Sequence, residues 1–250
     1  MNSGKVIPWL DPHAHPRFPS PYKASADGLL AAGGSLRPSW LISAYRLGIF
    51  PWYSEGTPIL WWCPHPRLIL EPKALKVHRS LSKSMRNRGF ETRLDTDFRQ
   101  VIKACASVNR MGESGGTWIT PQMLEAYCRL HRLGFAHSVE TWREGRLVGG
   151  LYGVLLGRVF FGESMFHLER DASKIALARL CLECRKRGIE LIDCQMSTPH
   201  LKSLGAVEIS REDFLERLER LVDEKPSFWE AQPRSAAELS DYFRKSSSLD

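Results

Sequence analysis

Residues 147–166, LVGGLYGVLLGRVFFGESMF, decide the fold of this chain. They contain two apolar runs, 147–156 and 159–166, with Gly157-Arg158 between them. Two runs of strand length around a two-residue turn that contains glycine are typical of a β-hairpin. We therefore expect two adjacent antiparallel strands in this part of the chain.

The residues after the hairpin change their period. Residues 172–187 are apolar on one face, basic at their end and followed by Gly188, which predicts a helix. Residues 189–195 then predict a further strand. Helices, antiparallel strands, a helix and a strand form an α+β order. This order fits a bent, mainly antiparallel sheet of the N-acetyltransferase (GNAT) type, whose central helix follows the hairpin.

The chain divides into three parts. Residues 1–66 are rich in proline and aromatic side chains, and we expect a small N-terminal domain with little regular sheet. Residues 67–224 form the GNAT-like domain and residues 225–250 a polar tail. The other elements that we expect are helices at 38–47, 73–89, 98–106, 121–133 and 212–222 and a strand at 138–142.

The net charge of +7 is concentrated in one segment. Between Lys73 and Arg110, ten Lys and Arg side chains stand against three acids, an excess equal to the net charge of the whole chain. Such a segment either binds a polyanion or forms a solvated basic face. Composition alone leaves both alternatives open.

Several protein classes are disfavoured by composition. Residues 1–20 lack the continuous apolar core of a signal peptide. No apolar run approaches the length of a membrane span, about 18 residues or more. Six cysteines in 250 residues do not resemble a secreted disulfide scaffold. We expect a cytoplasmic protein with reduced thiols.

Cofactor motifs are missing or weak. Cys181 and Cys184, with Cys194 and His200 downstream, could hold zinc, but the first two lie on an apolar helix face, which favours core packing. No Walker loop and no G-x-G-x-x-G is present. The Gln/Arg-x-x-Gly-x-Gly/Ala loop that cradles acetyl-CoA is also missing, and Asp171 would repel a phosphate from the helix start. We expect no metal and no acetyl-CoA.

Asp193 and Gln195 are the first candidates for chemistry. They are two residues apart on a predicted strand and therefore project from one face, with Ile192 and Cys194 on the other. A carboxylate and an amide side by side on a central strand either form hydrogen-bonded structure or line a cleft. The pattern alone does not decide between these.

Ordered motifs make the chain similar to the bacterial leucyl/phenylalanyl-tRNA–protein transferases. The similarity runs from about residue 28 to residue 222, and several of the motifs are individually rare. They are GGSL (33–36), AYRLGIFPWY (44–53), PILWWCP (58–64), GTWIT (116–120), AHSVE (136–140), LVGGLYGV (147–154), FGESMF (161–166), ASK (172–174), LIDCQ (191–195) and SLGA (203–206).

This resemblance implies an acetyltransferase-like domain that uses aminoacyl-tRNA in place of acetyl-CoA. It implies transfer of Leu, Phe or, less well, Met to acceptor proteins that begin with Arg or Lys, which marks them for N-end rule degradation. We expect a monomer that contacts neither DNA nor a membrane. The preference between Leu and Phe stays open.

The resemblance also implies roles for individual residues. Gln195 accepts a hydrogen bond from the attacking amine, Asp193 orients Gln195 and receives the proton indirectly, and Glu163 holds an ammonium group of a substrate. Trp52 and Trp118 enclose the terminal adenosine of the tRNA. The slot for the donor side chain comprises Leu151, Phe160, Met165, Leu177, Leu180 and Ile192, and the tRNA phosphates contact Arg79, Lys83 and Arg86.

Two alternatives come from other functional classes. The first is an acetyl-CoA-dependent N-acetyltransferase, against which the missing pyrophosphate loop argues. The second is a non-enzymatic RNA-binding module that uses the basic segment. RNA binding by the basic segment would not require Asp193 and Gln195 on a central strand.

Overall fold

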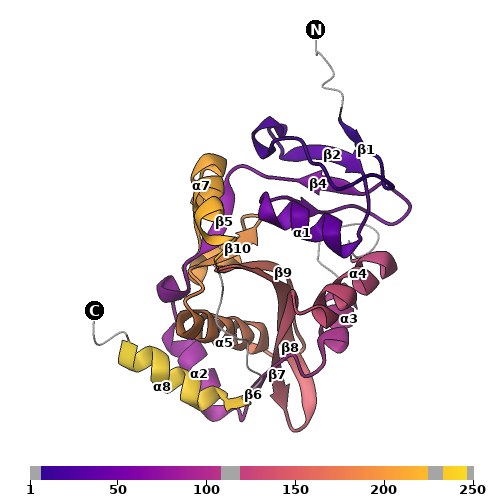
Figure 1. The fold of residues 1–250 in the computed structure, drawn as a ribbon. Coiled ribbons are helices and arrows are strands. Elements are labelled where there is room, and N and C mark those ends of the chain that lie inside the picture. Colours follow the sequence, from indigo (N-terminus) through magenta and orange to yellow (C-terminus); the bar gives the residue numbers. More distant parts are fainter. Residues whose placement is uncertain (1–6, 108–118, 225–232, 247–250) are drawn as a thin grey trace.

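The computed structural model describes residues 7–107, 119–224 and 233–246. Its larger sheet has the strand order β11-β5-β10-β9-β8-β7-β6-β12 and curls around helix α5 (Figure 1). Among these strand pairs, β9 and β10 run parallel and the others antiparallel, which confirms an α+β fold with a mainly antiparallel sheet. The strands are β5 (Arg67–Leu70), β6 (Glu91–Leu94), β7 (Ala136–Arg143), β8 (Arg146–Leu156), β9 (Val159–His167), β10 (Leu191–Gln195), β11 (Val207–Ile209) and β12 (Arg234–Ser235).

The N-terminal residues form a second sheet, so the expectation of little regular sheet there was wrong. Its order is β1-β2-β4-β3, and the Trp61 indole N–H donates to the Gly33 carbonyl at 2.8 Å within it. The strands are two to five residues long and lie between prolines, which hides their period in the sequence. They are β1 (Trp9–Leu10), β2 (Leu29–Gly33), β3 (Phe50–Pro51) and β4 (Leu60–Trp62).

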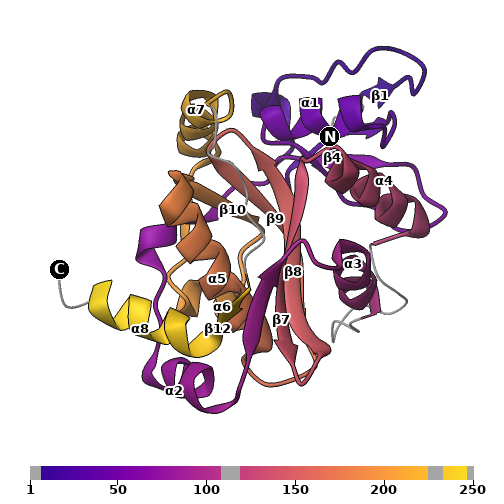
Figure 2. The ribbon, with the colours of Figure 1, turned by 60° about the horizontal axis from the view of Figure 1, so that its bottom comes forward.

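Helices cover both faces of the large sheet. Helix α5, with α2 and α8 beside it, covers one face, and α3 and α4 cover the other (Figure 2). We call these the α5 face and the α3 face. The helices of the described ranges are α1 (Pro38–Arg46), α2 (Arg79–Asn87), α3 (Phe98–Ser107), α4 (Pro121–Arg132), α5 (Ala172–Arg187), α6 (Pro199–Ser203), α7 (Arg211–Leu221) and α8 (Ala236–Ser246), with 3₁₀ turns η1 (Pro21–Lys23) and η2 (Pro72–Ala74).

The hairpin strands contribute side chains to two hydrophobic cores, because both of their faces are buried. Leu151 and Phe160 pack on the α5 face, whereas Tyr152 and Phe161 pack on the α3 face with helix α1. This explains why their sequence is continuously apolar and does not alternate. Helix α5 is buried on most of its circumference, and Gly188 ends it in a left-handed conformation.

Two predicted segments differ from the structure. The expected helix at 73–89 is divided, since η2 ends at Ala74 and α2 begins at Arg79. The polar tail contains β12 and α8 in its described part, and α8 buries Ala236, Leu239 and Phe243 against α2 and α5. Three apolar side chains in a polar segment were too weak a pattern to predict this helix.

No helix in the described parts of the chain combines the length and the apolar character that crossing a membrane would require.

Gly149 on β8 lets α5 approach the sheet. A β-carbon there would lie 2.5 Å from the Ala172 β-carbon, whereas one on Gly162 would meet its nearest neighbour, the Asp193 carbonyl oxygen, at 3.4 Å. We predict that Gly149→Ala lowers the free energy of unfolding by about 1–3 kcal/mol through overpacking. Gly162→Ala is the matched control and should change it less. Urea denaturation measures both, and equal effects would contradict this account of Gly149.

Candidate active site

The candidate site lies where the parallel strands β9 and β10 stop pairing. Their ladder joins Leu191–Asp193 to Val159–Phe161. Beyond it, each strand has an irregularity against its other neighbour. Glu163 is the extra residue in β9, and Cys194 the extra residue in β10. A bulge bends a strand and redirects its side chains. The two bulges therefore change the direction of the polar side chains of β9 and β10 at the same level of the sheet.

Asp193 is bound by a buried arginine. The Arg67 Nε and Nη2 atoms donate to the two Asp193 carboxylate oxygens at 2.8 and 2.6 Å, and both side chains are almost fully buried. The guanidinium also lies over the rings of Phe50 and Phe214, with its central carbon 5.0 and 4.4 Å from their centroids. This bidentate pair fixes the carboxylate in a single orientation.

Asp193 reaches Gln195 through the main chain. The Gln195 amide N–H donates to Asp193 Oδ1 at 2.9 Å, and Gln195 has a left-handed backbone with φ of 61°. A non-glycine residue in this conformation is strained and is found where the surroundings hold it. As predicted, the Asp193 and Gln195 side chains lie on one face and Ile192 on the other.

A chain of buried hydrogen bonds continues from Gln195. Its Nε2 donates to Glu163 Oε1 at 2.7 Å, and the Tyr127 hydroxyl donates to Glu163 Oε2 at 2.8 Å. The Tyr45 hydroxyl in turn hydrogen-bonds that of Tyr127. These residues come from β10, β9, α4 and α1, so the site joins the N-terminal part of the chain to the large sheet.

Burial dominates the electrostatics of Glu163. It raises the pKa of the Glu163 carboxyl from its ordinary value of 4.5 to about 7, although hydrogen bonds from Tyr45, Tyr127 and Gln195 lower it. Burial also raises the pKa of the Tyr127 hydroxyl well above its usual range, so Tyr127 stays protonated and donates. At neutral pH Glu163 is therefore poised to bind or release a proton.

The residues predicted for the donor slot lie on the opposite face. All six belong to the core of the α5 face, and Met165 is the only member that is more than slightly exposed. The sheet separates them from Glu163 and Gln195, whose side-chain hydrogen bonds lie on the α3 face. The set comprises Leu151, Phe160, Met165, Leu177, Leu180 and Ile192.

The predicted adenosine site is described in part. Trp52 is half-buried, and its ring centroid lies 5.5 Å from that of Trp62. Trp118 lies outside the described residues. The Tyr53 hydroxyl hydrogen-bonds the Thr120 hydroxyl at 3.3 Å. This bond joins the residue that follows Trp52 to the N-terminal end of α4.

The predicted phosphate-binding residues share one helix. Arg79, Lys83 and Arg86 are exposed on α2. Arg86 Nη1 donates to the Ser82 hydroxyl at 2.7 Å and to the Ser240 hydroxyl of α8 at 3.2 Å. The C-terminal helix therefore helps to hold one of these cations in place.

The cysteine motif is part of the core. Cys181 and Cys184 are fully buried in α5 and pack on the α5 face. Within the described ranges, no group of three or more His, Cys, Asp or Glu side chains is arranged to hold a metal ion.

Sequence reasoning missed three residues of the site: Arg67, Tyr45 and Tyr127. Tyr45 lies in the motif AYRLGIFPWY, in which the resemblance implied a role for Trp52 alone. Arg67 opens the apolar strand RLIL, and a charge beside such a run signals a buried partner. Tyr127 lies on the buried face of α4, and nothing local distinguishes it from a core residue.

Comparisons with known proteins agree on one family. The family model for the leucyl/phenylalanyl-tRNA protein transferase matches residues 69–219, and that for its N-terminal domain matches residues 34–65. The chain is similar to leucyl/phenylalanyl-tRNA–protein transferases of Azoarcus sp. (strain BH72), at 56% identity over 88% of this chain and 93% of the relative, and of Aromatoleum aromaticum, at 52% over 95% and 100%. Among solved structures, a functionally unknown conserved protein from Staphylococcus epidermidis aligns over 73% of this chain and 68% of its own, at 14% identity and a TM-score of 0.40. That likeness is too distant to carry an argument.

The raised pKa of Glu163 predicts a pH dependence of stability. The folded carboxyl keeps its proton up to about pH 7, whereas in the unfolded chain it loses the proton near 4.5. The contribution of Glu163 is therefore fully present below pH 4.5 and is lost as the pH rises to about 7. The loss is on the order of 3 kcal/mol. Urea denaturation from pH 4.5 to 8 should show this decline, and Glu163→Gln should remove it.

Tyr127→Phe is the second variant. It deletes a hydrogen bond that favours the ionised carboxylate of Glu163. The free energy of unfolding should therefore go on falling to a higher pH than in the parent protein. Identical pH profiles in the parent protein and Glu163→Gln would contradict the assignment.

Proposed function

Because the chain belongs to the leucyl/phenylalanyl-tRNA protein transferase family, we propose that it transfers Leu, Phe and, less well, Met to acceptor proteins that begin with Arg or Lys. As a member of this family it is an enzyme, an aminoacyltransferase, and its donor is an aminoacyl-tRNA. Its products are marked for N-end rule degradation. The observation that carries the proposal is the convergence of Gln195 and Glu163 at the bulges of two diverging strands.

The reaction is the aminolysis of an ester. The acceptor's α-amino nitrogen attacks the carbonyl carbon that links the amino acid to the terminal ribose of the tRNA. A C–N bond forms, the C–O bond to the ribose breaks, and a proton passes from nitrogen to the ribose oxygen. The amine has a pKa of about 7.7–8.0, so a fair fraction is already neutral. Positioning can therefore supply most of the rate effect, up to roughly 7–11 kcal/mol.

Gln195 receives the attacking amine in this mechanism. Its Nε2 is occupied by Glu163, which leaves Oε1 to accept an N–H of the amine. The amide is too weakly basic to remove a proton, so its role is to orient the nitrogen lone pair toward the ester carbonyl.

Glu163 and Asp193 take different roles. The pKa of Glu163, near 7, is close to that of an α-amine, so this carboxylate suits the binding of an ammonium and the transient uptake of its proton. Asp193 is paired with Arg67 through both oxygens, which argues against the indirect uptake of a proton that we expected. We assign Asp193 as a positioning residue for the Gln195 backbone.

The substrate would lie across the plane of the sheet. The donor side chain enters the apolar residues of the α5 face, and the amine approaches from the face of Glu163 and Gln195. The ester carbonyl then sits where β9 and β10 have separated. Residues 67–224 would form a GNAT-like domain beside the N-terminal domain of residues 1–66, in a cytoplasmic monomer.

A transfer assay tests the function. Radiolabelled Leu-tRNA is incubated with the protein and an acceptor that begins with Arg, and label should enter the acceptor. The same acceptor beginning with Ala is the control and should stay unlabelled. Gln195→Ala should lower the single-turnover rate about 10²-fold or more, because the amine loses its orientation. If label enters neither acceptor, or if Gln195→Ala keeps the parent rate, the proposal fails.

The role of α2 predicts a salt dependence. Phosphate contacts by Arg79, Lys83 and Arg86 release counterions, so the affinity for charged tRNA should fall steeply with salt. Removal of each contact should reduce the slope of log Kd against log salt by about 1. The control is Lys103→Ala, an exposed cation of α3 on the opposite face of the sheet. A slope that is the same in the parent protein and Lys83→Ala would rule out that contact.

A further inference from the structure

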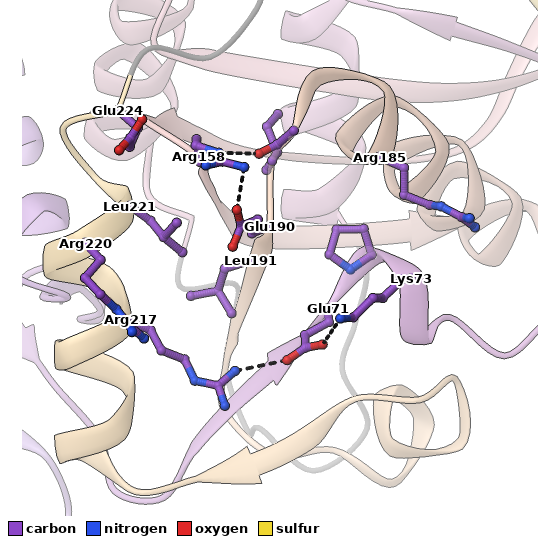
Figure 3. Close-up of a pocket in the computed structure, with 13 residues that line it drawn as sticks. Glu71, Lys73, Arg158, Arg185, Glu190, Leu191, Arg217, Arg220, Leu221 and Glu224 are labelled. Atoms are coloured by element: carbon purple, nitrogen blue, oxygen red, sulfur yellow. Dashed lines mark hydrogen bonds and ion pairs between the residues drawn. The ribbon is translucent and has the colours of Figure 1, made fainter.

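A pocket of about 740 Å³ opens at the end of β10 that lies away from Gln195 (Figure 3). It is bounded by the β8–β9 turn, the C-terminal end of α5, η2 and α7. Its apolar lining includes Leu191, Leu221 and Pro72. The charged lining residues are Glu71, Lys73, Arg158, Arg185, Glu190, Arg217, Arg220 and Glu224.

Arg158 is a cationic lining residue of the pocket whose position is fixed by several contacts. Its main-chain N–H donates to the Leu221 carbonyl at 2.9 Å, and its carbonyl accepts from the Glu190 N–H at 3.0 Å. Its side-chain Nε donates to the Gly188 carbonyl at 2.6 Å, and its guanidinium also pairs with Glu190. Gly188 and Glu190 therefore hold this side chain against the pocket, while about a third of it stays exposed.

The pocket carries more positive than negative charge. Five cations line it against three carboxylates. Glu71 is shared between Arg217, at 3.0 Å, and Lys73, at 3.6 Å. Arg220 is exposed on α7 and forms no ion pair with another described residue. In Figure 3, Arg217 and Arg220 come from one side of the pocket and Arg185 and Lys73 from the other.

We propose that this pocket binds phosphates of the ribose–phosphate backbone of the tRNA, separately from α2 and from the site of the terminal adenosine. The inference rests on the proposed function, which supplies the nucleic acid. Several arginine and lysine side chains around one opening, with excess positive charge, are the groups that contact phosphates without reading sequence. The acceptor is a poor occupant, because its N-terminus carries an α-ammonium and a second cation that this pocket repels.

Helix α8 links one lining residue of the pocket to the basic helix α2. The Arg185 guanidinium lies over the ring of Tyr242 on α8, with its central carbon 5.1 Å from the centroid. On the same helix, Ser240 hydrogen-bonds Ser82 of α2 at 2.7 Å. Helix α8 thus contacts both α2 and Arg185, which lines the pocket. One RNA that crosses α8 can contact both.

The test uses the full chain and intact Leu-tRNA. Arg220→Ala and Lys73→Ala remove cations from the pocket, and Arg129→Ala, an exposed arginine of α4 on the opposite face of the sheet, is the matched control. Kd is measured by fluorescence anisotropy as a function of salt. Each pocket variant should bind more weakly at low salt, with the slope of log Kd reduced by about 1. The ratio of its Kd to that of the parent should then shrink about fourfold between roughly 50 and 200 mM salt.

The kinetic readout separates the outcomes. Transfer from saturating Leu-tRNA should be normal in Arg220→Ala and Lys73→Ala, because neither touches the reacting groups. If transfer is normal and both variants bind tRNA with the parent's slope, this inference fails and the proposed function stands. If the variants change the KM for the acceptor and leave the affinity for tRNA unchanged, the pocket binds protein and the inference is again overturned. If the parent chain itself does not transfer label, the proposed function fails.

Discussion

The buried ion pair between Arg67 and Asp193 is the contact on which the candidate site depends. It joins the neighbouring strands β5 and β10 of the large sheet and holds the carboxylate that receives the Gln195 N–H. Removing one partner of such a pair leaves an uncompensated buried charge and costs about 3–5 kcal/mol. The rings of Phe50 and Phe214 enclose the guanidinium, so the N-terminal sheet and α7 also meet at this contact.

The two bulges explain how a sheet that is buried on both faces can hold the proposed reaction site. A regular parallel pair would bring the backbones of β9 and β10 together along their whole length and leave no room for an ester. One extra residue in each strand ends the pairing after Asp193 and Phe161. The same distortion places Gln195 in a strained backbone conformation, and the hydrogen bond to Asp193 offsets that cost.

Sequence periodicity was sufficient for the parts of the fold that are regular and long. The hairpin, α5 and the strand with Asp193 were predicted to within a few residues, because their apolar runs are continuous or strongly patterned. The short strands of the N-terminal sheet and helix α8 were missed, because their stability comes from partners that are distant in sequence. In the site, Asp193 and Gln195 could be placed on one face from their spacing, whereas Arg67 and Tyr127 reach them only through the tertiary fold.

The residues proposed for the donor slot and the polar groups lie on opposite faces of the sheet, which constrains the proposed chemistry further. If both substrates entered from one face, the donor side chain and the acceptor's cationic N-terminus would compete for the same space. Here the apolar core of the α5 face suits the donor side chain, whereas Glu163 on the other face suits a cation. Exchange of the two substrates would place a charge in an apolar core, which costs several kcal/mol unless the charge is paired. In the proposed mechanism the two substrates therefore enter from opposite faces of the sheet, and Glu163, at the bulge between them, is the group that takes up the proton.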